Sequence, residues 1–118
     1  MKVLICDDNK DFVSMVYEYL KEQEDMEIVG IAYDGNETLQ KIDEFSPDVV
    51  LLDVIMPEMD GLETLKQIRM KHQIAVALMT ADKELTASSE FKELGCDDFI
   101  TKPFMPLLLI EVIRNMCD

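Results

Sequence analysis

Five short apolar runs alternate along the chain with stretches whose apolar residues recur at helical spacing. The third run, Val49–Leu52, has four consecutive apolar residues, which is typical of a parallel strand covered on both faces. After the first run, Phe12, Val16 and Leu20 recur every four residues and predict one face of a helix. The expected strands are Lys2–Cys6, Glu27–Ala32, Val49–Leu52, Ala75–Met79 and Asp98–Lys102.

Polar and turn-forming residues mark where the expected helices begin and end. Asn9 or Asp11 is expected to cap the first helix, and Ser46-Pro47 to stop the second. The triplet Asp34-Gly35-Asn36 predicts a turn that closes the second strand. Gly95 is a typical helix C-terminal signal for a fourth helix over about 83–94. The fifth helix is expected over about 106–117, and it is apolar on more than one face.

Strict alternation of strand and helix predicts a single α/β domain over residues 1–118. Right-handed crossovers between parallel strands place helices on both faces of the sheet. For five such units, the common doubly wound strand order is 2-1-3-4-5. We therefore expect a five-stranded parallel sheet in this order, covered by five helices.

Residues with chemically useful side chains stand at the ends of four expected strands. Asp7 and Asp8 follow the first, Asp53 the third and Thr80 the fourth, while Lys102 ends the fifth. In the order 2-1-3-4-5 these strands are neighbours about 4.8 Å apart, so Asp8 and Asp53 can reach a common point. Lys102 lies roughly 10 Å of backbone from Asp53, and its long side chain can close much of that gap. We expect one crevice with three acids, a hydroxyl and an ammonium group.

These residue types together favour phosphoryl chemistry. Three neighbouring carboxylates repel one another and raise at least one pKa unless a cation lies among them. Hard oxygen ligands suit Mg²⁺, which usually takes one or two carboxylates plus phosphate oxygens. An aspartate is a known nucleophile that forms an acyl phosphate, and a metal and a lysine offset the charge of the phosphoryl group during transfer. The sequence therefore predicts phosphoryl transfer onto Asp53.

The motifs around these residues resemble those of bacterial two-component response regulator receiver domains, over the whole length of the chain. This family has the flavodoxin-like (CheY-like) fold. The resemblance implies that Asp53 accepts a phosphoryl group from a phosphohistidine on a histidine kinase or phosphotransfer protein. The matching motifs are Asp7-Asp8, Asp53, Met56-Pro57 with Asp60-Gly61, Thr80-Ala81 and Lys102-Pro103.

The resemblance also implies how the site is built. Asp8, Asp53 and the backbone carbonyl of Ile55 would bind Mg²⁺, with Asp7 acting mainly through water. Lys102 and Thr80 would contact the phosphoryl group. The Lys102-Pro103 peptide bond would be cis, a geometry that X-Pro bonds tolerate.

The same resemblance implies a switch. Thr80 would be drawn towards the phosphoryl group, and Phe99 would swing inward into the space it leaves. The surface of the fourth helix, fifth strand and fifth helix would then change, and control homodimerisation or an output such as transcription regulation. Residues 24–35 are similar to receivers of the sporulation-regulator type, which precede DNA-binding output domains; we expect no output domain within residues 1–118. Apolar Ile55 cannot orient an attacking water, so we expect slow self-dephosphorylation.

Composition limits the other function classes. The chain has 25 acidic and 11 basic residues, a net charge of −14, which argues against this domain binding nucleic acid or an anionic membrane directly. Three cysteines without close pairing favour a reducing, cytoplasmic setting. The sequence shows no signal peptide and no transmembrane span.

Two other function classes stay open. A pseudo-receiver would bind partners without phosphorylation, although such proteins normally lack some of the acids, the Thr or the Lys that this chain keeps. A phosphatase of the haloacid dehalogenase type also uses an Asp nucleophile and Mg²⁺, but it places Asp-x-Asp after the first strand, where this chain has Asn9 two residues after Asp7. We expect no enzyme in the usual sense, but a phosphoacceptor that assists its own phosphorylation and slow dephosphorylation.

Overall fold

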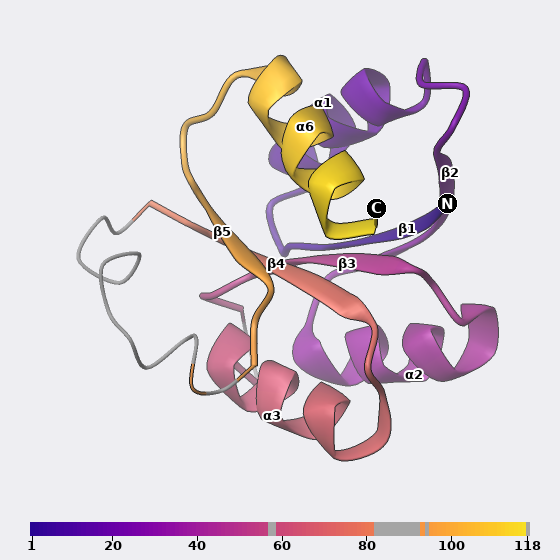
Figure 1. Cartoon of the computed structure of the whole chain (residues 1–118). Coiled ribbons are helices and arrows are strands. Elements are labelled where there is room, and N and C mark those ends of the chain that lie inside the picture. The colour runs from indigo at the N-terminus through magenta and orange to yellow at the C-terminus, as the bar shows by residue number, and fades with distance from the viewer. Residues whose placement is uncertain (57–58, 82–92, 94, 118) are drawn as a thin grey trace.

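The computed structural model describes residues 1–56, 59–81, 93 and 95–117, and within them five parallel strands form one sheet (Figure 1). The strand order is β2-β1-β3-β4-β5, so the predicted order is confirmed. Every residue of the central strand β3 is buried, as its unbroken apolar run predicts. The strands are β1 Lys2–Cys6, β2 Glu27–Ala32, β3 Val49–Asp53, β4 Ala75–Thr80 and β5 Asp98–Thr101.

Four α-helices are present in the described part of the chain, where the sequence predicts five. The predicted fourth helix, over about 83–94, falls almost entirely on residues outside those described. The predicted fifth helix is α6, with the expected bounds. The helices are α1 Lys10–Leu20, α2 Gly35–Phe45, α3 Gly61–Lys71 and α6 Pro106–Cys117.

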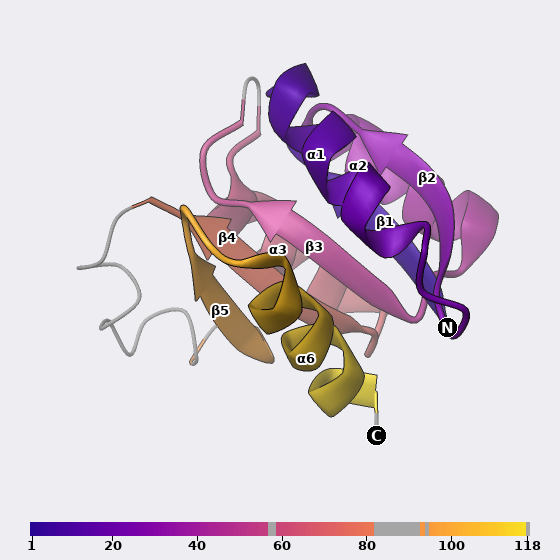
Figure 2. The same ribbon diagram turned by 90° about the horizontal axis from the view of Figure 1, so that it is seen from above.

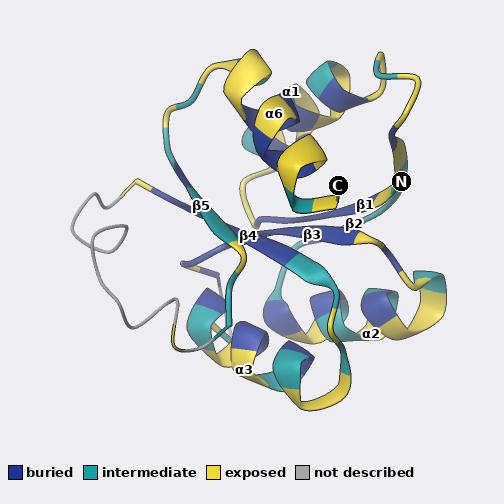
Figure 3. Cartoon of the chain, viewed as in Figure 1, coloured by how far each residue is buried: buried dark blue, intermediate teal, exposed yellow. Residues whose placement is uncertain are grey.

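The helices cover both faces of the sheet (Figures 1 and 2). Helices α1 and α6 lie on one face, and α2 and α3 lie on the other. Successive side chains of a strand point to opposite faces, so Leu51 belongs to the core under α1 and α6, while Leu52 belongs to the core above α2 and α3. Figure 3 shows the central strands buried and the outer sides of the helices exposed. Within the described residues, no helix is both long and apolar enough to cross a membrane.

Polar caps fix where the helices on the two faces begin. The Asn9 side chain accepts a hydrogen bond from the Phe12 N–H at 3.0 Å, so the predicted cap of α1 is confirmed. The second strand ends at Ala32, just before Asp34-Gly35-Asn36, as predicted, but these residues begin α2: Asp34 is its cap and accepts from the Glu37 N–H at 2.7 Å. Short acidic side chains favour turns and helix N-caps by the same hydrogen bonding, so the local sequence does not separate the two.

Candidate functional site

The candidate site lies at the carboxyl edge of the sheet, where β1, β3 and β5 end. Asp53 is the last residue of β3, Asp7 follows β1, and Lys102 follows β5. The backbone fixes both flanking positions: the Asp7 N–H donates to the Ala32 carbonyl at 3.0 Å, and the Lys102 N–H donates to the Thr80 carbonyl at 2.7 Å. The fold therefore brings the ends of three separate chain segments to one place.

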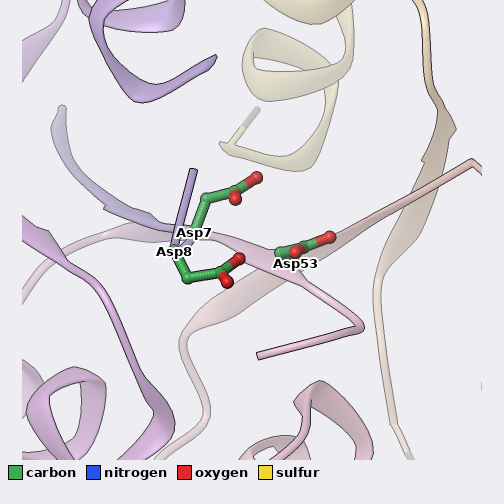
Figure 4. Close-up of side chains that lie close together, drawn as sticks. All are labelled: Asp7, Asp8 and Asp53. Atoms are coloured by element: carbon green, nitrogen blue, oxygen red, sulfur yellow. The ribbon is translucent and has the colours of Figure 1, made fainter. Parts of the chain in front are cut away.

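Three carboxylates converge at this edge (Figure 4). Asp7, Asp8 and Asp53 each offer an oxygen, and these oxygens all lie within 4.8 Å of one another. Asp7 and Asp53 are buried, whereas Asp8 is exposed. The three acids that the sequence places at the strand ends are thus brought together, with one side of the cluster open to water.

Lys102 brings a positive charge to this cluster. Its Nζ donates to Asp7 Oδ2 at 2.7 Å and to Asp53 Oδ1 at 3.3 Å. The Asp7 carboxylate also accepts a hydrogen bond from the Asn9 N–H, at 2.9 Å. Sequence reasoning placed Lys102 near Asp53, and the structure shows that it bridges both acids and lies closer to Asp7.

The surroundings of Asp53 shift its acidity. Burial raises the pKa of Asp53 to about 6, even though the Lys102 ammonium lowers it. This value includes the charges of Asp7 and Asp8, which also raise the pKa. A buried acid beside two like charges favours a neighbouring cation, which would stabilise its ionised form.

The donor set of the cluster fits a hard cation. The three acids offer only oxygen atoms, and one side of the group is open to solvent. Mg²⁺ prefers carboxylate oxygens and keeps several water ligands, which an acid cluster open to water on one side allows. The residues present therefore fit Mg²⁺.

The other predicted site residues lie around this cluster in different environments. Thr80 is the last residue of β4, is buried, and stands in register with Thr101 of β5. Ile55 is 75% exposed, so it does not pack in the hydrophobic core. Phe99 of β5 is half-buried and packs on the α2–α3 side of the sheet. The predicted contacts of Thr80 with a phosphoryl group and of the Ile55 carbonyl with a metal, and the predicted inward swing of Phe99, stay predictions.

The chain segments on either side of the site have special geometry. The Lys102-Pro103 peptide bond is cis, as the family resemblance implies. The Gly61 N–H donates to the Val54 carbonyl at 2.6 Å, which closes the loop after Asp53. A Cβ at Gly61 would lie 2.4 Å from the Asp53 carbonyl oxygen, so the loop end requires glycine at this position.

Sequence reasoning missed two aromatic residues beside the site. Phe12 appeared only as part of the apolar face of α1, yet Lys102 Nζ lies 4.0 Å from the centre of its ring. Phe104 contacts the same ring edge to face, with centroids 5.7 Å apart. No sequence signal links these residues, because an apolar position early in an amphipathic helix is typical of ordinary core packing.

Solved structures of receiver domains closely match this fold. The response regulator domain of Thermotoga maritima CheB is 31% identical, with a TM-score of 0.91, and the match covers 99% of this chain and 96% of that one. Vibrio cholerae CheY4 is also 31% identical, with a TM-score of 0.88 and coverage of 98% and 97%. The BeF3-activated receiver domain of Klebsiella pneumoniae RstA is 25% identical, with a TM-score of 0.89 and coverage of 99% and 98%.

The sequence also matches a family description over most of its length. Residues 3–114 match the response regulator receiver domain. The match includes the three acids, Thr80 and Lys102, which the fold gathers at one edge of the sheet. The chain therefore belongs to the response regulator receiver domain family.

Proposed function

We propose that this domain is the phosphoacceptor of a two-component His-Asp phosphorelay, with Asp53 as the accepting residue. The observation that carries the proposal is the position of Asp53: it ends the central strand, 3.3 Å from the Lys102 ammonium and close to two other acids. Receiver domains interact with histidine kinases or phosphotransfer proteins. A phosphohistidine on such a partner is the proposed donor.

The proposed reaction is a single in-line displacement at phosphorus. One Asp53 oxygen forms a bond to the phosphorus of the donor phosphohistidine while the phosphorus–nitrogen bond breaks. The electron pair of that bond leaves with the imidazole, which takes up a proton, and Asp53 becomes an acyl phosphate. Lys102 stays close enough to offset negative charge on the phosphoryl oxygens, and the Thr80 hydroxyl is proposed to donate to one of them.

The proposed metal site uses the same acids. Asp8, Asp53 and the Ile55 carbonyl would hold Mg²⁺, with Asp7 acting mainly through water. Bound Mg²⁺ would supply positive charge next to the transferred group. Asp7, held by Lys102 and the Asn9 N–H, would keep its carboxylate facing the site.

The proposal is tested by labelling with acetyl phosphate and Mg²⁺, followed by intact-protein mass spectrometry. The parent protein should gain one phosphoryl group, and Asp53→Asn should gain none. Asp43→Asn, which removes an exposed acid from α2, is the matched control and should label like the parent. Equal labelling of Asp53→Asn would contradict the assignment. Absence of labelling would favour a pseudo-receiver, and repeated turnover of a phosphomonoester would favour a phosphatase.

We also propose that phosphorylation acts on the face formed by the predicted fourth helix, β5 and α6. Thr80 and Phe99 would relay the change, because they lie on the adjacent strands β4 and β5. Helix α6 presents Leu107 at 69% exposure and Leu108 at 47%, as expected for a helix that is apolar on more than one face. This exposed apolar surface supports a homodimer that tightens on phosphorylation.

Sedimentation velocity with and without beryllofluoride tests the dimer. The parent protein should shift towards dimer with the phosphoryl mimic, and Leu107→Glu should weaken that shift by about tenfold or more in dissociation constant, by placing a charge in an apolar contact. Met70→Glu is the control, because Met70 on α3 is similarly exposed at 76%. A parent protein that stays monomeric at high concentration with the mimic would contradict the dimer.

The proposed output is transcription regulation through an attached DNA-binding domain. It is supported by the similarity of residues 24–35 to receivers that precede such domains. Reading the coding sequence past residue 118 tests it. A continuation into a helix-turn-helix would agree, and a stop codon there would contradict it.

A further inference from the structure

The Lys102 ammonium contacts two acids and also lies over an aromatic ring. We propose that Phe12 is a positioning residue for Lys102 in phosphoryl transfer, acting through a cation–π contact. The inference rests on the proposed function, since it assigns a residue that controls the same site. It gives α1 a part in the chemistry, although no α1 residue belongs to the acid cluster.

The distances support a cation–π contact. Lys102 Nζ is 4.0 Å from the centre of the Phe12 ring, well inside the limit of about 6 Å for such contacts. The same atom lies 2.7 Å from Asp7 Oδ2 and 3.3 Å from Asp53 Oδ1. Only 20% of the Lys102 side chain is exposed, so water screens the contact less than it would at an open surface.

Phe12 is itself held in place from two directions. Its N–H donates to the Asn9 side chain at 3.0 Å, in the first turn of α1, and the Asn9 N–H donates to Asp7 at 2.9 Å. One short segment therefore fixes both the acid and the ring that flank the ammonium. On the other side, the Phe104 ring meets Phe12 edge to face, at 86° between ring planes.

The Phe12 ring can limit the motion of the flexible Lys102 side chain. The Lys102 side chain has four rotatable carbon–carbon bonds, so the ammonium can swing into solvent and leave Asp53. During transfer it must also move its contact from Asp7 towards the phosphoryl oxygens. The face of a phenyl ring attracts a cation without demanding one hydrogen-bond direction, so it can hold the ammonium near both positions. Loss of this attraction should slow phosphorylation.

Graded fluorination of Phe12 separates this attraction from simple packing. Fluorine withdraws electron density from the ring face and weakens the cation–π contact while the ring keeps nearly the same shape. Site-specific incorporation of mono-, di- and trifluorophenylalanine at Phe12 should lower the initial rate of labelling by acetyl phosphate stepwise, by between about twofold and about thirtyfold in total. The same series at Phe45, the last residue of α2, should leave the rate unchanged.

A second readout uses metal-free protein and no phosphoryl donor. The Phe12 ring current should move the NMR signals of the Lys102 ε-methylene protons upfield. Phe12→Leu should return them to ordinary lysine values, whereas Phe12→Tyr should keep the upfield shift. Ordinary shifts in the parent protein would overturn the contact.

The two assays also separate failure of the inference from failure of the proposed function. A labelling rate that is constant across the fluorinated series, in a parent protein that does become phosphorylated, overturns the role of Phe12 alone. A parent protein that never becomes phosphorylated overturns the proposed function, and the positioning role with it. An upfield Lys102 signal together with stepwise slowing supports the inference.

Discussion

Asp53 combines burial with a charge that it must carry in order to react. Its side chain is only 12% exposed and lies beside two other acids, and its pKa is raised to about 6. The ionised form that attacks phosphorus is therefore less stable than that of an aspartate in water. This cost is what a cation at the acid cluster would offset.

Carbon-detected NMR of the metal-free protein should follow the Asp53 carboxyl group through a titration with a midpoint near pH 6. Added Mg²⁺ should lower this midpoint, because the bound cation favours the ionised form. A midpoint for Asp53 near 4 without metal would show that burial does not control its acidity.

Asp53→Asn should stabilise the metal-free protein at neutral pH. Between about pH 4 and the folded-state pKa of about 6, the folded protein binds more protons at Asp53 than the unfolded chain does, so its stability falls as pH rises. Above that window the loss reaches about 3 kcal/mol as an upper value, and the Asn variant avoids it. Below about pH 4 the two proteins should be equally stable.

Urea unfolding of both proteins across this pH range checks the sign. Asp8→Asn serves as the control, because Asp8 is exposed and its removal should change stability much less. An Asp53→Asn protein less stable than the parent at neutral pH would contradict the account.

Ile55 should determine how long the phosphoryl group lasts. Its exposed side chain cannot hold a water molecule in line with the acyl phosphate, so Ile55→Asn, which can, should shorten the phosphoryl lifetime several-fold. Timed mass spectra after removal of acetyl phosphate measure the lifetime, and Met70→Asn controls for an equally exposed change elsewhere. A parent half-life of seconds, or no change in Ile55→Asn, would contradict this prediction.

The position of the Lys102 side chain could be predicted from the sequence only in part. Strand order alone places its ammonium within reach of Asp53, because that follows from strand spacing and side-chain length. Its closer contact with Asp7 and its contact with the Phe12 ring depend on the Lys102 rotamer. Three groups, Asp7, Asp53 and Phe12, attract the ammonium and so determine that rotamer. Sequence periodicity carries no information on that choice.

At the scale of elements, glycine at position 61 allows the loop after Asp53 to end close to β3. Gly61→Ala should lower the free energy of unfolding by about 1–3 kcal/mol, because the new Cβ would meet the Asp53 carbonyl oxygen and the Val54 Cα. The shift of β3 that relieves this contact should also slow labelling of Asp53. Gly30→Ala is the matched control, since its new Cβ would meet only side-chain atoms, the nearest of them on Leu4 at 3.3 Å, and no backbone atom among its closest neighbours. Equal losses of stability in the two variants would contradict the role of the loop.

The elements themselves were largely predictable. Unbroken apolar runs such as Val49–Leu52 are buried on both faces, and this strong constraint fixes the strands and their ends. The start of α2 was not predictable, because Asp34 suits a turn and a helix cap equally well. Arg69 was also missed: it donates to the Gly95 and Ile74 carbonyls, both at 2.7 Å, and so ties α3 to the segments that precede β4 and β5. Polar contacts of this kind leave no periodic pattern.

For the whole molecule, the sheet order brings two distant segments together in one acid cluster, and a third segment adds Lys102 to it. The net charge of −14 makes this concentration of carboxylates more costly without a cation. Mg²⁺ should therefore stabilise the folded protein, by about 2.7 kcal/mol at a concentration one hundred times its dissociation constant. Thermal unfolding should show this gain in the parent protein and a much smaller one in Asp53→Asn. Equal stabilisation of the parent protein and Asp53→Asn by Mg²⁺ would show that the metal binds at another site.

The most direct test of the central claim is to locate the phosphoryl group chemically. Protein labelled with acetyl phosphate and Mg²⁺ is treated with borohydride, which reduces an aspartyl phosphate to homoserine, and the peptides are then sequenced by mass spectrometry. The account predicts homoserine at position 53 and unmodified aspartate at positions 7 and 8. Homoserine at Asp7 or Asp8, or an unreduced phosphoester on Thr80, would contradict it.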